Sequence, residues 1–251
     1  MKTRISIFSF LMFVLFSCAE LEQFARQTLE DDKPLTQSEI ISGLKEALIV
    51  GTNKSADILG VTDGYYKDEL VKILLPPEAD VIVTNIGRVP GGQQLLDDVL
   101  LSINRAAEDA VLEAKPIFVN SIKSMTINDA VGILRGENNA ATMYLHRTTY
   151  DGLYNLYQPK IQQSLDKKLV GNVSTSQSWD TLTSKWNEVA NSLVGQIAGL
   201  KPVETKLDEY LTGKALDGLF LKIGEEEKLI RKDPAARVTA LLKRVFGSAD
   251  S

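Results

Sequence analysis

The sequence is poor in the residues that most often build metal and nucleophile sites. Its 251 residues include one cysteine, Cys18, and one histidine, His146. A zinc site normally takes several cysteine or histidine ligands, so we expect no metal and no cofactor. A Ser-His-Asp triad would have to use His146, which lies in a helical pattern between Leu145 and Arg147. We interpret His146 as a helix-surface or core histidine.

Loops that bind nucleotides and calcium are also missing. There is no GxxxxGK[ST] loop, and no GxGxxG follows a strand pattern. Glu225, Glu226 and Glu227 are adjacent, but successive helical residues point about 100° apart, and no EF-hand spacing surrounds them. The net charge is −5, which argues against nucleic acid as a partner.

One long apolar run is present, and it lies at the N-terminus. Lys2 and Arg4 precede an apolar stretch from Ile5 to Phe16. A charged start followed by a short apolar core predicts a signal peptide over residues 1–17. The stretch is shorter than the roughly 20 residues that span a bilayer. A core helix or a membrane anchor helix is the alternative, and no second segment of transmembrane length appears in the sequence.

The single cysteine follows this run directly. Leu15-Phe16-Ser17-Cys18 resembles a bacterial lipobox, although Phe16 is larger than the usual residue at its position. We therefore expect lipidation of Cys18 and attachment to a membrane through the N-terminal lipid, with a free or catalytic thiol as the alternative. The mature chain would keep 26 Lys and Arg against 33 Asp and Glu, a net charge of −7. Ala19 after the cysteine favours the outer membrane under the enteric sorting rule, so we expect a bacterial cell-envelope protein facing the periplasm.

The rest of the chain divides by polarity. Residues 18–35 are polar and acidic, and we expect them to form a tether between the lipid and the folded part. Residues 36–251 are expected to form a single helical domain; residues 170–178 could be a boundary or a loop within it. Thr36-Gln37-Ser38-Glu39 matches a capping box, which predicts that a helix begins there.

Other helix boundaries are predicted from capping residues and prolines. The segment 126–129 (TIND) is expected to begin a helix that Gly136 ends. Pro116 and Pro159 are placed in first helical turns. Asp233-Pro234 reads as an N-cap followed by a first-turn proline.

Apolar side chains recur mainly three and four residues apart. Trp179, Leu182 and Trp186 follow this spacing, so the tryptophans are expected in the core rather than in a ligand platform. Period-two alternation is rare, and the strand-like stretch 81–86 is short and isolated. The sequence predicts an all-α fold: a compact domain of about eight to ten helices with no significant sheet.

Two charged residues stand in a helical pattern over residues 93–114. One face of this segment is apolar, from Leu96 to Ala114. A second line, spaced 4, 3 and 4 residues apart, lies on the other side and consists of Leu101, Arg105, Glu108 and Leu112. Because leucines bound this line, we expect the helix to be central and both charged residues to be partly buried.

A carboxylate also completes an apolar stripe in residues 215–234. Glu227 stands at the position that continues the stripe of Leu216, Phe220, Ile223 and Ile230. A buried carboxylate must be paired, hydrogen-bonded or protonated. Arg231, four residues later, is the expected partner, and Arg105 and Arg237 are alternatives.

These residues define a candidate polar cluster: Arg105, Glu108, Glu227 and Arg231. The hypothesis is that they line a cleft or a buried site together. The alternative is a structural ion-pair network that fixes helix register, or residues on a solvated rim. Acid–base chemistry would be possible if Glu108, Asp217 and Glu227 faced one cleft, but the spacing assigns no catalytic residue.

Three long segments carry a family resemblance: 102–111 (SINRAAEDAV), 125–145 (MTINDAVGILRGENNAATMYL) and 215–247. They resemble the bacterial family named domain of unknown function 4197, over about residues 35–247. The resemblance implies a helical, exported, often lipid-anchored protein. It implies no known activity and no catalytic roles.

The expected function is therefore that of an uncharacterised envelope lipoprotein, a non-catalytic helical module that binds or scaffolds a protein, peptide or small ligand. One alternative is an envelope enzyme using Glu, Asp and Arg side chains in a helical cleft. Another is a purely structural or assembly component. An exposed apolar groove would favour the binding module.

Overall fold

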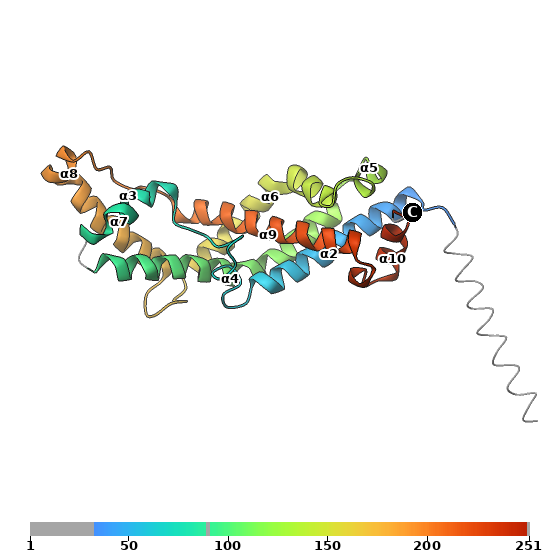
Figure 1. Cartoon of the computed structure of the whole chain (residues 1–251), viewed down its shortest axis with the longest axis horizontal. Helices are drawn as coiled ribbons and strands as arrows, with labels where there is room; N and C mark the ends of the chain where they lie inside the picture. Colours follow the sequence, from blue (N-terminus) through green and yellow to red (C-terminus); the bar gives the residue numbers. More distant parts are fainter. Residues whose placement is uncertain (1–32, 89–90, 250–251) are drawn as a thin grey trace, which may run out of the picture.

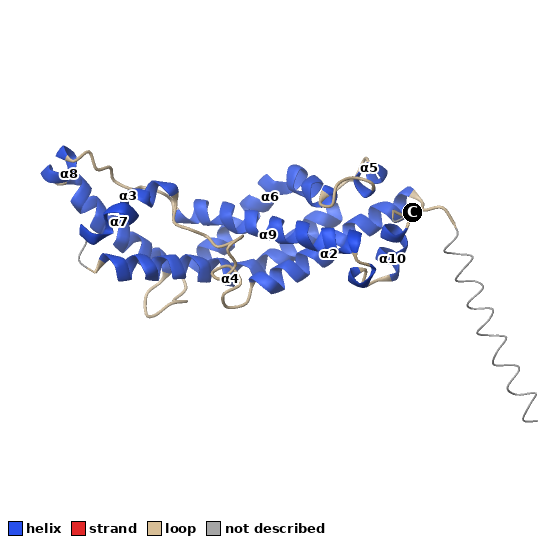
Figure 2. Ribbon diagram, in the orientation of Figure 1, coloured by secondary structure: helices blue, strands red, loops and turns tan. Residues whose placement is uncertain are grey.

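The computed structural model describes residues 33–88 and 91–249. Nine α-helices and three short 3-10 helices lie within these ranges, which contain no β-strand beyond one isolated bridge between Val170 and Val173. Figure 2 shows this helical architecture. The all-α prediction is confirmed. The predicted signal peptide and Cys18 lie outside the described residues, as does most of the predicted tether.

Four long helices form the body of the domain. They are α2 (Gln37–Leu59), α4 (Gly92–Ser124), α6 (Ala140–Leu165) and α9 (Leu207–Lys232). Helix α4 packs on α2 and α6, and α9 packs on the same two helices (Figure 1). The apolar face predicted for residues 93–114 is buried, including Val99, Ile103 and Val111. Helix α4 also contacts α7 and α9, but Leu112, on the side expected to be covered, is 44% exposed.

Shorter elements lie at the two ends of the long axis (Figure 1). Helices α3 (Asp80–Asn85), α7 (Thr175–Asn191) and α8 (Leu193–Ile197) lie toward one end. Helices α5 (Ala130–Leu134) and α10 (Ala240–Gly247) lie toward the other, where the described chain begins. The 3-10 helices are Pro77–Ala79, Ile86–Arg88 and Pro234–Ala236.

The predicted helix boundaries are confirmed in part. Thr36 and Glu39 form the expected capping box, with the Glu39 amide 3.2 Å from the Thr36 hydroxyl. Asp233 caps a 3-10 helix that has Pro234 in its first turn. The prediction for 126–129 is wrong, because Asp129 is itself the N-cap of α5 and accepts from the Gly132 amide at 2.8 Å.

The two prolines predicted in first turns lie instead in helix interiors. Pro116 is within α4 and Pro159 within α6, and both are exposed. An interior proline leaves the carbonyl four residues earlier without its helical partner. On an exposed face water can satisfy that carbonyl, so the helix continues past the proline. The strand-like residues 81–86 are helical, in α3 and the turn that follows it.

Within the segment 170–178, residues 170–174 form a short turn and residues 175–178 are already the first turn of α7. Ser174 caps this helix in a capping box with Gln177. Trp179 and Trp186 of α7 are buried, as predicted, and α7 packs on α4.

Candidate functional site

The first pair of predicted site residues, Arg105 and Glu108, fastens the turn after α2 to α4. Arg105 Nη1 lies 2.6 Å from Glu108 Oε2, and Arg105 Nη2 lies 2.6 Å from Asp63 Oδ1. The other Glu108 oxygen accepts from the backbone amides of Tyr65 and Tyr66, each at 3.1 Å. Glu108 is 4% exposed. Asp63 has φ +72°, which is in the left-handed region that few residues other than glycine adopt. The ion pair with Arg105 is made by a residue in this uncommon backbone conformation.

The second pair, Glu227 and Arg231, ties α9 to the ends of two other helices. Glu227 is 1% exposed, and its carboxylate accepts from the amides of Ala141 and Thr142 at 3.0 and 2.7 Å. These are first-turn amides of α6, which have no partner within their own helix. Arg231 Nε lies 2.8 Å from Glu227 Oε1. The guanidinium also donates to the last carbonyls of α5, those of Ile133 and Leu134.

The four predicted residues thus form two separate pairs in the structure. Within the described ranges, no hydrogen bond or ion pair joins Arg105 or Glu108 to Glu227 or Arg231. Arg237, the alternative partner of Glu227, donates instead to the carbonyls of Ile230 and Arg231. Each carboxylate is occupied by its arginine and by backbone amides, an arrangement that fixes helix positions.

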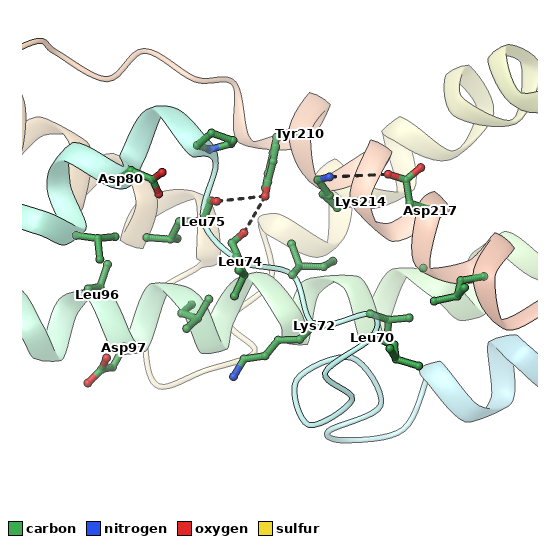
Figure 3. Close-up of a pocket in the computed structure, with 17 residues that line it drawn as sticks. Leu70, Lys72, Leu74, Leu75, Asp80, Leu96, Asp97, Tyr210, Lys214 and Asp217 are labelled. Atoms are coloured by element: carbon green, nitrogen blue, oxygen red, sulfur yellow. Dashed lines mark hydrogen bonds and ion pairs between the residues drawn. The ribbon is translucent and has the colours of Figure 1, made fainter.

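A cavity that none of these four residues lines lies elsewhere in the described part of the chain. It is a groove of about 820 Å³ between α4, α9, α3 and the segment 70–77 (Figure 3). Exposed leucines line it: Leu70 is 69% exposed, Leu74 is 62% exposed and Leu221 is 43% exposed. Lone exposed leucines are ordinary on protein surfaces, but several around one concavity indicate a binding surface. We call this the α9 groove.

Charged side chains of both signs border the α9 groove. Lys214 and Asp217 stand on the α9 side, and Lys72 and Asp97 stand on the opposite side (Figure 3). Asp80 of α3 also contributes to the lining. Lys214 Nζ and Asp217 Oδ2 are 4.0 Å apart and largely exposed, so this pair contributes little to stability.

Two polar side chains hold the wall formed by residues 70–77. The Tyr210 hydroxyl donates to the carbonyls of Leu74 and Leu75 at 3.0 and 3.2 Å (Figure 3). Asn104, fully buried on α4, donates to the Ile73 carbonyl at 2.8 Å and accepts from the Ile73 amide at 2.9 Å. Burial raises the pKa of the Tyr210 phenol, with Glu78 as a second cause.

A second cavity, of about 510 Å³, continues along α9. It shares Asp217 and Leu221 with the α9 groove. His146 lies here, half-buried, with its ring centroid 4.6 Å from that of Tyr150 and 4.8 Å from that of Phe220. The histidine therefore packs against aromatic rings on α6 and α9.

Sequence reasoning named the four residues of the two ion pairs, as one cluster, and predicted the pairing of Glu227 with Arg231, but it missed the α9 groove. The available signal was the run Leu70-Val71-Lys72-Ile73-Leu74, in which every residue except Lys72 is apolar. Val71 and Ile73 are buried, whereas Leu70 and Leu74 point outward. Two apolar side chains that point toward solvent from one short segment are unusual, and Leu70 and Leu74 are of this kind.

Residues 33–88 and 91–249 contain neither a cluster of metal ligands nor a membrane-spanning helix. No group of three or more His, Cys, Asp or Glu side chains within them could hold a metal ion. No helix in the same ranges is long and apolar enough to cross a membrane.

A family model described as "Protein of unknown function (DUF4197)" matches residues 34–247. No curated protein and no solved structure matches the chain. The matched range includes every helix from α2 to α10 and all residues of the α9 groove. The chain therefore belongs to the DUF4197 family.

Proposed function

We propose that this protein is a lipid-anchored, non-catalytic binding module of the bacterial cell envelope. An acylated Cys18 attaches it to the outer membrane, and the helical domain faces the periplasm. Support for the anchor comes from the sequence of residues 1–18, where a charged start and an apolar core precede a lipobox-like cysteine.

The α9 groove is the proposed binding site, and its ligand is an amphipathic helix of another envelope polypeptide. The observation that carries this proposal is the combination of exposed leucines with charged groups on both sides of the groove. An amphipathic helix presents an apolar stripe flanked by charges, so it complements both features. The volume of about 820 Å³ suits a few apolar anchor side chains.

The contacts of the buried carboxylates favour binding over acid–base catalysis. Glu108 and Glu227 accept from backbone amides and arginines, and neither lines the α9 groove. Asp217 does line it, where its carboxylate lies 4.0 Å from the Lys214 ammonium. General acid–base work needs groups within hydrogen-bond reach of one substrate, and the two glutamates are already occupied.

Site-specific photocrosslinking tests the binding site. A photoreactive amino acid is placed at position 74, inside the groove, or at position 156, an exposed leucine site on α6 that does not line it. Irradiation of cells should give one discrete polypeptide adduct from position 74. The adduct should disappear with Leu221→Asp and persist with Leu229→Asp, a matched leucine on α9 outside the groove. No adduct at 74, or the same adduct at 156, contradicts the proposal.

The anchor is tested separately with a clickable fatty acid fed to cells. The wild-type protein should incorporate the label and fractionate with the outer membrane. Cys18→Ala should remove the label, since Cys18 is the only cysteine. Label retained by Cys18→Ala would show that the acyl group is not on this thiol.

A further inference from the structure

Helix α8 presents the most exposed apolar side chains of the described residues. Leu193 is 75% exposed, Val194 is 76% exposed and Ile197 is 80% exposed. They stand at positions i, i+1 and i+4 of one short helix, which places them within about 100° of arc around its axis. Figure 1 places α8 at the end of the long axis opposite the start of the described chain. We call these three side chains the α8 tip.

The segment that carries the α8 tip is free of charge. Residues 189–200 (VANSLVGQIAGL) contain no Asp, Glu, Lys or Arg, although charged residues make up 24% of the chain. Glu188 and Lys201 border the uncharged run. A charged group would oppose transfer of this segment out of water. Because residues 189–200 contain none, no charge has to be desolvated when they leave water.

The backbone of the α8 tip is hydrogen-bonded internally. Ser192 accepts from the Gly195 amide at 3.0 Å, the Leu200 amide donates to the Gly195 carbonyl at 2.9 Å, and the Gly199 amide donates to the Gln196 carbonyl at 3.1 Å. Gly195 is packed so closely that an added Cβ would lie 2.1 Å from the Val189 carbonyl oxygen. The helix is therefore held in place on α7, and these backbone groups are already paired within the segment.

We propose that the α8 tip inserts into a lipid bilayer at the boundary between the headgroups and the acyl chains. Three aliphatic side chains offer on the order of 300 Å² of apolar surface, whereas a stable protein interface buries about 800 Å² per partner. These three side chains alone therefore fall short of the area that a stable protein interface needs. A bilayer accepts a few projecting apolar side chains at the headgroup boundary without a matching pocket.

The length of chain before the domain permits this contact on the membrane that carries the anchor. This step rests on the proposed anchor at Cys18. Residues 19–32 number 14 and can span up to about 50 Å. Helix α4, with 33 residues, is about 50 Å long and runs along the long axis. The domain can therefore lie along the bilayer, with both ends at its surface.

An environment-sensitive fluorophore tests insertion in the full chain. Val194→Cys carries the fluorophore at the tip, and Leu156→Cys, 58% exposed on α6, is the control position. One arm uses the acylated protein in phosphatidylethanolamine–phosphatidylglycerol vesicles. A second arm replaces the acyl anchor by Cys18→Ser and an N-terminal histidine tag, held on vesicles of the same lipids with a nickel-chelating lipid, so failure of the lipid anchor does not affect it.

The expected result in both arms is emission at shorter wavelength from position 194, quenched by nitroxide-labelled lipid, with no change at position 156. Ile197→Asp should abolish the shift at 194, and Leu229→Asp, a matched change away from the tip, should leave it intact. An unchanged spectrum at 194 in both arms overturns the proposal. A shift that appears without vesicles and grows with protein concentration also overturns it, because it indicates a second copy as the occupant.

Discussion

Glu227 and Arg231, one turn apart on α9, bind each other and together cap two other helices. Arg231 Nη2 lies 2.7 Å from Glu227 Oε1. Glu227 accepts hydrogen bonds from the amides at the start of α6, which have no partner within that helix. Arg231 donates hydrogen bonds to the carbonyls at the end of α5. A helix terminus normally satisfies such groups with a local side chain or with water. Here one buried ion pair does so for two helices across the core.

Glu227→Gln should therefore lower the free energy of unfolding by about 3–5 kcal/mol, because Arg231 keeps its charge without a counter-ion in a buried position. Urea unfolding followed by circular dichroism measures the change. Glu225→Gln is the matched control, since Glu225 is 46% exposed and pairs with Lys222 on the surface; it should cost about 0–1 kcal/mol. Equal losses in the two variants would contradict a structural role for the buried pair.

Asn104 is expected to be as important for the groove as for stability. Asn104→Ala leaves the amide and carbonyl of Ile73 without partners and should cost roughly 2–4 kcal/mol. Because Ile73 lies in the wall of the α9 groove, exchange of its amide hydrogen should also become faster. Asn120→Ala, an exposed asparagine on the same helix, serves as the control. Unchanged exchange at Ile73 would show that Asn104 does not hold this wall.

Local sequence signals predicted a helix boundary or a buried residue correctly where the sequence allowed only one good interpretation. Thr36 with Glu39, and Trp179 with Trp186, each had a single good interpretation, and the structure confirms them. The segment 126–129 had two, because Thr126 and Asp129 are both good N-caps; Asp129 is the one that accepts a first-turn amide. Pro116 and Pro159 were misplaced because exposure, which sequence does not give directly, decides whether a helix tolerates an interior proline.

The candidate site was harder to predict, for a related reason. Charged residues in an apolar register can be found by spacing, and Glu108 and Glu227 are indeed buried. Whether they meet depends on the axial offset between α4 and α9, which no local pattern encodes. The α9 groove depends in turn on how residues 70–77 lie between these two helices, through Asn104 and Tyr210.

Acid should destabilise the domain through Asp63 and Asp68. Hydrogen bonds from Lys67, and then from Arg105, hold the pKa of Asp63 below its ordinary value. Lys222 is the main cause of the lowered pKa of Asp68. A carboxyl whose pKa is lower in the folded state stabilises it above the unfolded-state pKa, about 3.9, and this contribution is lost as pH falls through the folded-state pKa.

The urea midpoint should accordingly stay level between about pH 7 and pH 5 and decline below about pH 4. The double change Asp63→Asn and Asp68→Asn should lower the midpoint at neutral pH and make the acid decline shallower. A decline of the same steepness in the double variant would assign acid sensitivity to other carboxyls.

Two glycines in helix interiors should respond to alanine with opposite signs. Gly43 of α2 faces α10, and an added Cβ would lie 2.7 Å from a methyl carbon of Val245. Gly152 of α6 has no atom within 4 Å of that position. Alanine gains about 0.5–1 kcal/mol over glycine in a helix, so Gly152→Ala should stabilise by this amount. Gly43→Ala should be net destabilising by about 1–2 kcal/mol, because overpacking outweighs the gain.

Thermal and urea unfolding of both glycine variants measure these effects, and Val245→Ala provides the test of mechanism. If the clash with the two methyl carbons of Val245 causes the loss, Gly43→Ala should cost less in a Val245→Ala background than in the wild type. Additive effects of the two changes would mean that the methyl carbons of Val245 are not what makes glycine necessary at position 43, because alanine at 245 keeps the Cβ that lies 2.8 Å from the added Cβ.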